Sequence, residues 1–579
     1  MPVNKLSFRI GGEAGQGVES SGSGFVKALT RGGLHALGIP DYYSRIRGGH
    51  NYFTIRVDDK PVLALRETIE LLLALNAETI ARHIDSLVPG GGIIVDEATH
   101  FDEQLTQDRD VRIYRAPMMQ IAEQEGSSVM ANTAALAVAA GLTGYDLQHI
   151  LGVVDDNFRR KGDAVVQANR RVAQAAYDLA GERFKGAFRW KLEARELPPR
   201  MTLTGNQAFA MGALMAGCKF AAGYPMTPAT PVLEYLAQHA AQWGLVTKHA
   251  ESEVAAINMV VGAAHAGVRA MAPTSGGGFD LMTEGLSLAA MTETPVVIYL
   301  AQRPGPATGL PTRTAQADLL LALHTSHGEF MRIVLAPHTA QEFFWSAVRA
   351  FNLAEKYQCT VIVLSDHYCA NLIQPANLED FDFRAIQIDR GKLLGPEEVD
   401  ALPEYKRYAL TPDGISPRAI PASSPNAVYL TSGDMHREDG HFTEDPEITT
   451  AMVSKLVGKA DLAREEMRPP LVEGPEDAEI TFVSWGSSYG PVHEAMEILN
   501  ERGIAANMAH FVDLWPFPAE KARQALSGAR RLVDVEGNAM AQFAFLLRAH
   551  AGIEVDQKIL RFDGRGFTPD YILGRLEVR

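Results

Sequence analysis

The sequence contains few cysteines and no long apolar run. Only Cys218, Cys359 and Cys369 are present among 579 residues, and no two of them form a C-x-x-C pair. Three separated thiols cannot by themselves ligate a four-cysteine iron–sulfur cluster or zinc site, nor do they suggest a secreted disulfide scaffold. No stretch approaches the roughly 20 apolar residues of a membrane span, and the first ten residues do not look like a signal peptide. We therefore expect a cytoplasmic protein with no membrane segment and no metal site of its own.

Positive charge is also scarce. The formal net charge is −16 at pH 7, which argues against a nucleic-acid partner, because that binding needs a concentrated basic face. Apolar residues make up 46% of the chain and charged residues 21%, as is ordinary for a globular protein. The length exceeds what one core supports, since domains typically contain roughly 100–200 residues. Several domains are therefore expected.

The alternation of apolar runs and helical patterns divides the chain into four regions. Residues 1–195 alternate as an α/β domain, and residues 200–385 alternate more regularly. Residues 386–474 contain a Pro- and Ser-rich stretch without periodicity, which predicts an irregular connecting segment. Residues 475–579 form a smaller α/β domain. The predicted fold class is multidomain α/β.

Within residues 200–385, short apolar runs predict buried strands separated by helices, and hence a parallel, doubly wound sheet. The expected helices include Val254–Ala266 and Gln341–Tyr357. The expected strands are Leu245–His249, Arg269–Ala272, Pro295–Ala301, Arg332–Leu335 and Thr360–Ser365.

A glycine-rich turn, Gly11–Gly17, follows the first expected strand and precedes a helical pattern. Closely spaced glycines allow backbone N–H groups to approach a phosphate at a helix N-terminus, although the spacing is not G-x-G-x-x-G. Residues 44–50 add two arginines, whose forked guanidinium groups suit phosphates. A tight turn and a solvated basic loop, both without a ligand, are the alternatives. The candidate residues are Gly15, Gln16, Gly17, Arg45 and Arg47.

The loop after Gly223 carries three prolines in seven residues, beginning at Tyr224 and Pro225. Proline fixes the backbone, and loops at the carboxyl ends of parallel strands are where α/β sheets bind ligands. Thr227 lies between two prolines, so its hydroxyl is expected to point in a nearly fixed direction. A purely structural turn is the alternative.

Two carboxylates stand where the strand Leu245–His249 gives way to a helix. Glu251 and Glu253 could simply complement the helix dipole, as acids in first turns often do. However, Glu253 opens an apolar run with no other carboxylate. An acid at that position is expected to be partly buried and is a candidate proton donor.

Two further strand ends carry special loops. Residues 274–279 form a glycine cluster that includes Ser275 and Gly276. Residues 302–313 form a rigid Gly/Pro loop with the polar groups suited to hold a small carboxylate. Those groups are Arg303, Thr308, Thr312 and Arg313. Four successive strand ends with special loops make a chance occurrence improbable.

These four loops, in this order, resemble the pyrimidine-binding domain of the 2-oxoacid:ferredoxin oxidoreductases. The family motif Y-P-I-T-P stands here at residues 224–228 with Met226 in place of Ile. Residues 251–256, 274–279 and 302–312 also follow the family pattern. The first region resembles the family's γ domain. The last region, with residues 511–518 and 535–538, resembles its transketolase-C-like domain.

The resemblance implies roles for particular residues. Glu253 would contact N1′ of the aminopyrimidine of thiamine diphosphate and promote formation of the reactive nucleophile. Thr227, Arg303 and Thr312 match positions that hold the 2-oxoacid, and the γ domain is implicated in the coenzyme A step. The other implied cofactor-binding residues are Tyr224, Pro225, Ser275 and Gly276.

The resemblance also implies a missing partner. The chain lacks the G-D-G…N motif that holds the diphosphate through Mg²⁺, and it lacks cluster cysteines. In this family both lie on a β subunit, which would carry Mg²⁺ and a [4Fe-4S] cluster and form an (αβ)₂ heterotetramer that reduces ferredoxin. The γ–α fusion favours 2-oxoglutarate, converted with coenzyme A to succinyl-CoA. Alternatives are pyruvate or branched 2-oxoacids, a transketolase or dehydrogenase E1 component, and a non-catalytic scaffold subunit.

Overall fold

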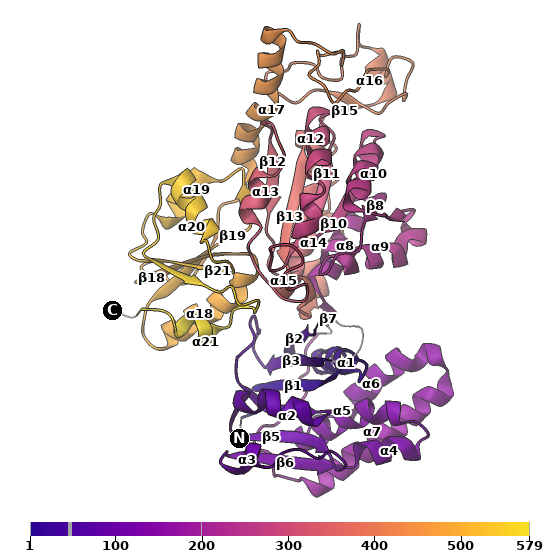
Figure 1. Cartoon of the computed structure of the whole chain (residues 1–579), viewed down its shortest axis with the longest axis vertical. Helices are drawn as coiled ribbons and strands as arrows, with labels where there is room; N and C mark the ends of the chain where they lie inside the picture. Colours follow the sequence, from indigo (N-terminus) through magenta and orange to yellow (C-terminus); the bar gives the residue numbers. More distant parts are fainter. Residues whose placement is uncertain (1, 44–48, 199, 578–579) are drawn as a thin grey trace. The chain divides into compact units, whose positions relative to one another are not determined.

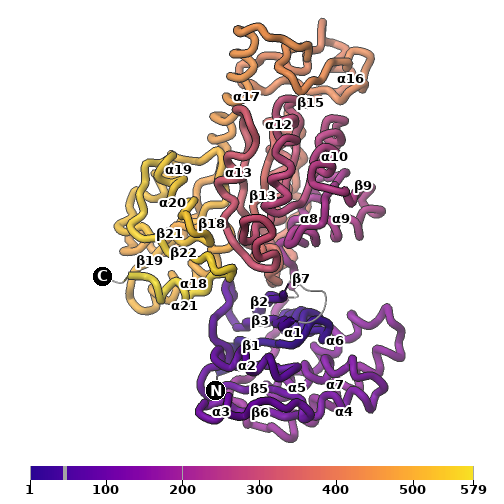
Figure 2. The backbone as a smooth tube through the Cα atoms, in the orientation of Figure 1, coloured from indigo at the N-terminus to yellow at the C-terminus, as the bar shows by residue number. Residues whose placement is uncertain are grey.

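The computed structural model describes residues 2–43, 49–198 and 200–577 of the chain (Figures 1 and 2). The backbone divides into two compact units. The N-terminal unit consists of Met1–Thr204, Asn371–Asp380 and Thr568–Gly574. The core unit consists of Gly205–Ala370, Phe381–Phe567 and Arg575–Arg579. No helix in the described part of the chain is both long enough and apolar enough to cross a membrane.

The described residues of the N-terminal unit form a sheet with strand order β2-β3-β1-β4-β5-β6. Strands β1, β4, β5 and β6 run parallel, whereas β2 and β3 form an antiparallel ribbon beside β1. A separate short ribbon pairs β7 (Arg200–Leu203) with β14 (Gln374–Asn377). The six strands are β1 (Leu6–Glu13), β2 (His35–Asp41), β3 (His50–Asp58), β4 (Ile69–Ala74), β5 (Leu87–Asp96) and β6 (Val111–Ala116).

Both faces of this sheet are covered, because successive side chains of a strand point to opposite sides. Leu71 and Leu73 of β4 pack in one apolar cluster with α1, α5, α6 and α7, whereas Leu72 packs in another with α2. The mixed α/β architecture expected for this region is therefore confirmed. The helices are α1 (Val18–Arg31), α2 (Ala77–His83), α3 (Gln104–Gln107), α4 (Met118–Gln124), α5 (Ala131–Thr143), α6 (Leu147–Phe158) and α7 (Asp163–Arg183).

The core unit is built on a sheet with strand order β20-β12-β13-β11-β10-β8-β9. All of these strands run parallel except β20, which pairs antiparallel with β12 at the edge. Every residue of β11 is buried, as expected for a strand covered on both faces. The predicted strands are confirmed to within two residues at each end. The strands are β8 (Phe220–Gly223), β9 (Val246–His249), β10 (Ala270–Thr274), β11 (Val296–Gln302), β12 (Arg332–Leu335), β13 (Thr360–Asp366) and β20 (Asp513–Trp515).

Helices lie on both faces of this sheet (Figure 1). Ile298 and Leu300 of β11 belong to the apolar cluster that contains α10 and α12. The intervening Tyr299 packs against Phe209 of α8 and Phe343 of α14. The helices are α8 (Gly205–Met215), α9 (Thr230–Trp243), α10 (Glu253–His265), α11 (Gly276–Asp280), α12 (Thr283–Met291), α13 (Leu319–His324), α14 (Ala340–Tyr357) and α15 (His367–Asn371).

The last part of the core unit forms a second sheet with strand order β17-β19-β18-β21-β22. Strands β19, β18, β21 and β22 run parallel, and β17 is an antiparallel edge strand. The expected strand Ile480–Trp485 is confirmed as β18. The other elements are β17 (Leu471–Glu473), β19 (Ala506–Phe511), β21 (Leu532–Glu536), β22 (Gln557–Leu560), α18 (Tyr489–Glu501), α19 (Ala519–Leu526), α20 (Gln542–Leu546) and α21 (Pro569–Leu573), of which α21 belongs to the N-terminal unit.

The expectation of an irregular segment over residues 386–474 is wrong for its last part. There α17 (Pro446–Glu466) is a 21-residue helix, capped by the Asp445 side chain. Two of the residues on its buried face are lysines, Lys455 and Lys459, and both form ion pairs with the buried Glu293. Burial by itself would raise the pKa of Glu293, but the two ammonium groups lower it to about 2. The helix therefore lacks the apolar periodicity that would have indicated it.

Candidate active site

The four loops singled out in the sequence follow β8, β9, β10 and β11, and these neighbouring parallel strands all end at the same edge of the sheet. Specific contacts bring the loops together. Arg303, after β11, contacts the loop after β8. The glycine turn after β10 (residues 275–278) lies close to Glu253, after β9, and to Asp318, at the end of the β11 loop. The predicted gathering of these loops into one site is therefore present.

Glu253 is the first residue of α10. Ser252 caps this helix, its hydroxyl accepting the Ala255 N–H at 3.3 Å. The Glu253 side chain is only 3% exposed, and its Oε1 atom has no hydrogen-bond partner among the described residues. Leaving a buried polar atom without a partner typically costs about 1–3 kcal/mol. The fold therefore holds a carboxyl oxygen ready for a proton or for a donor on a bound molecule.

Two carboxyl groups approach the glycine turn so closely that side chains would not fit at two of its three glycines. A Cβ atom added to Gly278 would lie 2.5 Å from Glu253 Oε1 and closer still to the Thr274 hydroxyl. One added to Gly276 would lie 2.6 Å from Asp318 Oδ2. The middle residue, Gly277, has only a carbonyl oxygen near it, at 3.9 Å. The first and third glycines are thus required by their neighbours, and the middle one is not.

Ser275, at the start of this turn, is also buried without a partner. Its side chain is 0% exposed, and its Oγ atom makes no hydrogen bond within the described part of the chain. Unpartnered oxygens of Glu253, Ser275 and Asp318 therefore surround one short turn. Such a concentration of unsatisfied polar groups is unusual in a folded protein and indicates a ligand site.

Arg303 joins the β11 loop to the proline loop. Its Nη1 donates to the carbonyl oxygen of Thr227 at 2.8 Å. Burial lowers the pKa of Arg303, while the nearby Asp318 and Glu253 raise it. The side chain is half-buried, so its remaining donors are available at the site.

The proline loop is anchored by hydrogen bonds to buried residues of α8 and β11. The peptide bond between Thr227 and Pro228 is cis. The Pro228 carbonyl accepts the Asn206 amide N–H at 3.0 Å, and the Asn206 oxygen accepts the Tyr299 hydroxyl at 2.9 Å. Thr227 is half-buried, whereas Tyr224, like the adjacent proline, is exposed. The loop is thus anchored from the centre of the sheet, and its tyrosine faces solvent.

Two residues that sequence reasoning missed fix the end of the β11 loop. The Gln316 side chain donates to the Trp485 carbonyl at 2.8 Å and accepts the Gly537 N–H at 2.7 Å, which ties the loop to the ends of β18 and β21. Asp318 precedes α13, as a helix-capping residue often does, but its side chain makes no capping hydrogen bond. Thr312, predicted as a substrate ligand, lies buried in the same loop.

Asp318 is replaced in its capping role by a residue from far along the chain. The Gln542 side-chain oxygen accepts the Leu320 N–H at 3.0 Å. The Asp318 Oδ2 atom instead faces the glycine turn. No sequence pattern indicated this, because an aspartate before the run Leu319-Leu-Leu is typical of an ordinary helix start.

The predicted phosphate-binding turn lies in the N-terminal unit. Gly15 and Gly17 adopt φ values of +94° and +70°, and Gln16 accepts the Glu13 N–H through its side-chain oxygen at 2.6 Å. A cavity of about 550 Å³ beside the turn is lined by acidic side chains including Glu19 and Asp41, and by no lysine or arginine among the described residues. The predicted residues Arg45 and Arg47 lie outside the described residues.

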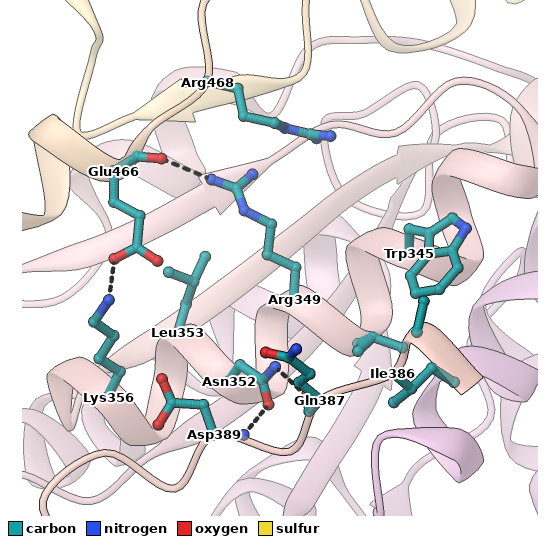
Figure 3. A pocket seen from close by; sticks show the side chains of 12 residues that line it. Trp345, Arg349, Asn352, Leu353, Lys356, Ile386, Gln387, Asp389, Glu466 and Arg468 are labelled. Atoms are coloured by element: carbon teal, nitrogen blue, oxygen red, sulfur yellow. Dashed lines mark hydrogen bonds and ion pairs between the residues drawn. The ribbon is translucent and has the colours of Figure 1, made fainter. Parts of the chain in front are cut away.

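A second cavity, of about 410 Å³, lies along α14 (Figure 3). Its charged side chains already have partners: Arg349 pairs with Asp513 at 2.5 Å and Lys356 with Glu466 at 2.7 Å. Asn352 also donates to a backbone carbonyl of the opposite wall at 2.8 Å. These contacts join α14 to β20 and to the connecting segment.

Comparisons with known proteins agree with this arrangement. Residues 211–455 match the family model "Pyruvate flavodoxin/ferredoxin oxidoreductase, thiamine diP-bdg". Residues 7–179 match "Pyruvate ferredoxin/flavodoxin oxidoreductase", and residues 478–572 match "Pyruvate:ferredoxin oxidoreductase core domain II". Together these models cover all three α/β parts of the chain.

Individual relatives are similar over nearly all of the chain or over about two thirds of it. The chain is 33% identical to "2-oxoacid:ferredoxin oxidoreductase 2, subunit alpha" from Aeropyrum pernix, covering 97% of this chain and 95% of the relative. It is 36% identical to "2-oxoglutarate synthase subunit KorA" from Methanothermobacter thermautotrophicus, over 65% of this chain and 97% of the relative.

A solved structure from Magnetococcus marinus, a 2-oxoglutarate:ferredoxin oxidoreductase with 2-oxoglutarate, coenzyme A and succinyl-CoA bound, superposes with a TM-score of 0.92 at 32% identity and covers 99% of both chains. Full-length similarity to α subunits, together with family models over each α/β part, establishes the relationship. The chain belongs to the 2-oxoacid:ferredoxin oxidoreductase family and corresponds to its α subunit.

Proposed function

We propose that this chain is the α subunit of a thiamine-diphosphate-dependent enzyme that converts 2-oxoglutarate, coenzyme A and oxidised ferredoxin to succinyl-CoA, CO₂ and reduced ferredoxin. The observation that carries the proposal is the buried Glu253 carboxyl, whose Oε1 atom lies unpartnered against the glycine turn. The choice of 2-oxoglutarate as substrate is supported by the similarity to the Methanothermobacter 2-oxoglutarate synthase subunit and to the Magnetococcus 2-oxoglutarate:ferredoxin oxidoreductase.

The residues of the site fit the pyrimidine end of thiamine diphosphate. An aminopyrimidine offers several hydrogen-bonding atoms, and the site supplies unpartnered oxygens from Glu253 and Ser275 around a run of three glycines. Tyr224, Pro225 and Gly276 would complete the contact. When bound, the cofactor supplies the nucleophilic carbon and electron sink that decarboxylation of a 2-oxoacid requires.

Glu253 is the acid–base group in this proposal. Its Oε1 atom can hold a proton at the ligand or accept one from it, because no protein group among the described residues occupies that position. Burial excludes water from this oxygen, so a proton shared there is not lost to solvent. The fixed start of α10 keeps the carboxyl in one place through the reaction.

Arg303 would hold the carboxylate of the 2-oxoacid, assisted by Thr227 and Thr312. One guanidinium nitrogen is engaged by the Thr227 carbonyl, which fixes the plane of the group. The remaining N–H donors suit the two oxygens of a carboxylate. Every 2-oxoacid carries that carboxylate, so these residues are expected to recognise the substrate class rather than one member of it.

A β partner is required for the rest of the site. Burial raises the pKa of the Cys218 and Cys359 thiols to about 12, and it also raises the pKa of the Cys369 thiol well above its usual value, which disfavours the thiolate form that ligates metal. We therefore place Mg²⁺ and the [4Fe-4S] cluster on a β subunit within an (αβ)₂ heterotetramer that delivers electrons to ferredoxin. A cytoplasmic location stays a prediction.

The N-terminal unit is proposed to contribute to the coenzyme A step through the Gly15–Gly17 turn together with Arg45 and Arg47. Two observations bear on this proposal: the left-handed backbone at two of the glycines and the cavity beside them. The acidic side chains that line this cavity oppose phosphate binding. The proposal therefore depends on the positive charge of the two arginines.

The test uses the complex recovered through a tag on this chain. Dye reduction should be fastest with 2-oxoglutarate and coenzyme A; faster turnover of pyruvate or a branched 2-oxoacid would select the alternative substrate. Glu253→Gln should lower turnover by about 10²–10⁴-fold, as loss of a positioned acid–base group does. The exposed Glu251→Gln is the matched control and should be mild. Full activity in Glu253→Gln would favour a scaffold subunit instead.

A further inference from the structure

Asp318 is a second carboxyl group of the site to which neither the family resemblance nor the comparisons give a role. Its backbone N–H donates to the Gln302 side chain at 2.9 Å, which fixes it beside the residue that precedes Arg303. Its Oδ2 atom is shielded from solvent, has no partner among the described residues and lies against the Cα of Gly276. Glu253 occupies the equivalent position at Gly278. The glycine turn is thus flanked by two unpartnered carboxyl groups.

Asp318 faces charged groups of both signs. Burial raises the pKa of its carboxyl, the carboxylate of Asp280 on α11 adds to this, and the guanidinium of Arg303 opposes it, so that the pKa lies at about 7. At neutral pH the group is therefore divided between a neutral and an ionised form.

The two forms have different consequences for Arg303. Neutral Asp318 leaves the guanidinium with its full positive charge for an incoming anion. Ionised Asp318 partly neutralises it and also repels any carboxylate that binds beside it. Two carboxylates in one buried site rarely ionise together, because their repulsion is weakly screened there.

We propose that the proton on Asp318 controls binding of the 2-oxoacid carboxylate at Arg303: the neutral carboxyl admits the substrate and the ionised one opposes it. The inference rests on the proposed function, because that function places the substrate carboxylate at Arg303. When the substrate binds to the ionised form, a buffer acid gives up one proton, which forms the O–H bond of neutral Asp318, and no bond within the substrate changes. Asp318 is a gating residue and takes no part in the chemical step.

A linked proton gives a quantitative expectation. Above about pH 7 the apparent affinity for the 2-oxoacid carboxylate should fall by about tenfold per pH unit, because one proton is bound for each ligand. The effect belongs to binding, so KM should rise with pH while kcat stays level. Asp318→Asn keeps the shape of the side chain and cannot ionise, so its KM should not change with pH in this range.

The test is calorimetric titration of the intact complex with N-oxalylglycine, an unreactive dicarboxylate analogue of 2-oxoglutarate, at pH 8 in two buffers of different ionisation heat. The wild type should take up close to one proton per analogue bound. Asp318→Asn should take up none and bind about tenfold more tightly at this pH. The exposed Asp280→Asn is the matched control and should still take up a proton.

Three results would overturn the proposal. Equal proton uptake by the wild type and Asp318→Asn assigns the proton elsewhere. Zero uptake by the wild type removes the gate even if the variant fails to fold. Failure of the wild type to bind either N-oxalylglycine or oxamate, its pyruvate-like counterpart, at pH 6 and pH 8 removes the placement of the substrate itself, and with it the proposed function. Binding without proton uptake leaves that function standing and removes only the gate.

Discussion

Two glycine-rich turns stand at strand-to-helix junctions in this chain, and they differ in what their neighbours lack. In the N-terminal unit, β1 extends to Glu13, beyond the predicted start of the turn at Gly11. The turn that remains, residues 14–17, is closed by its own Gln16 side chain, which accepts the Glu13 N–H. In the core unit, residues 275–278 are surrounded by buried oxygens with no partner among the described residues. Glycine spacing alone therefore does not distinguish a turn that is complete in itself from one that is completed by a ligand.

The unsatisfied oxygens are the informative difference. Each buried polar atom without a partner typically costs about 1–3 kcal/mol of folding free energy. The unpartnered oxygens of Glu253, Ser275 and Asp318 therefore destabilise the fold. Such costs are retained where a bound molecule offsets them or where chemistry needs them. The following predictions test whether each of the two turns binds a ligand.

Of the four predictions that follow, the largest effect should come from filling the core-unit turn. Gly278→Ala places a methyl group 2.5 Å from Glu253 Oε1, so the carboxyl must move. A displacement of about 1 Å at a reacting group can cost about 10²-fold in rate. Gly277→Ala is the matched control, since only a carbonyl oxygen lies near it, at 3.9 Å. Turnover and thiamine diphosphate content of the purified complex provide the comparison; equal loss in both variants would make the turn merely structural.

A smaller effect on catalysis is expected from changing Arg303, which we place at the substrate carboxylate. Arg303→Lys replaces a planar fork with a point charge, and loss of hydrogen bonds to a charged group costs about 1.5–3 kcal/mol. We expect KM to rise by about 10–100-fold for every 2-oxoacid tested. If only 2-oxoglutarate were affected, Arg303 would instead read the distal carboxylate, and the placement of the substrate would be reversed.

The third prediction concerns how Asp318 makes the stability of the folded chain depend on pH. The Asp318 carboxyl has its pKa raised from 3.8 to about 7 in the folded chain, so the folded state holds the proton more tightly than the unfolded state. Stability is therefore lost as pH rises between about 4 and 7. Asp318→Asn avoids this loss, which is at most about 4 kcal/mol. Its melting temperature relative to the wild type should be higher at pH 8 than at pH 4.5; the reverse trend would contradict the burial of an ionisable group.

The smallest effect should appear at the N-terminal turn. If Gly15–Gly17 hold phosphates of coenzyme A, the exposed Glu19 on the cavity wall opposes them. Glu19→Gln should then tighten coenzyme A binding by about two- to fivefold, since exposed charge pairs are worth about 0.2–1 kcal/mol. Glu182→Gln, exposed on α7, is the control. An unchanged dissociation constant would leave the turn without a ligand.

Most of this fold, and the meeting of the four loops at one edge of the sheet, could be predicted from the sequence. Strands such as β12 and β18 were found because their residues are buried on both faces and form short apolar runs. Glu253 was found because an acid at the start of an apolar helix is unusual. Asp318 was missed because the capping bond that would explain it is made by Gln542, more than 200 residues away, and α17 was missed because buried lysines interrupt its apolar face.

The central claim is that Glu253 exchanges a proton with the bound cofactor. Its most direct test is the rate of hydrogen–deuterium exchange at C2 of thiamine diphosphate in the complex, measured by rapid quench for the wild type, Glu253→Gln and Glu251→Gln. We predict that exchange slows by about 10²–10⁴-fold in Glu253→Gln alone, with the cofactor still bound. Exchange at the wild-type rate in Glu253→Gln would contradict the account.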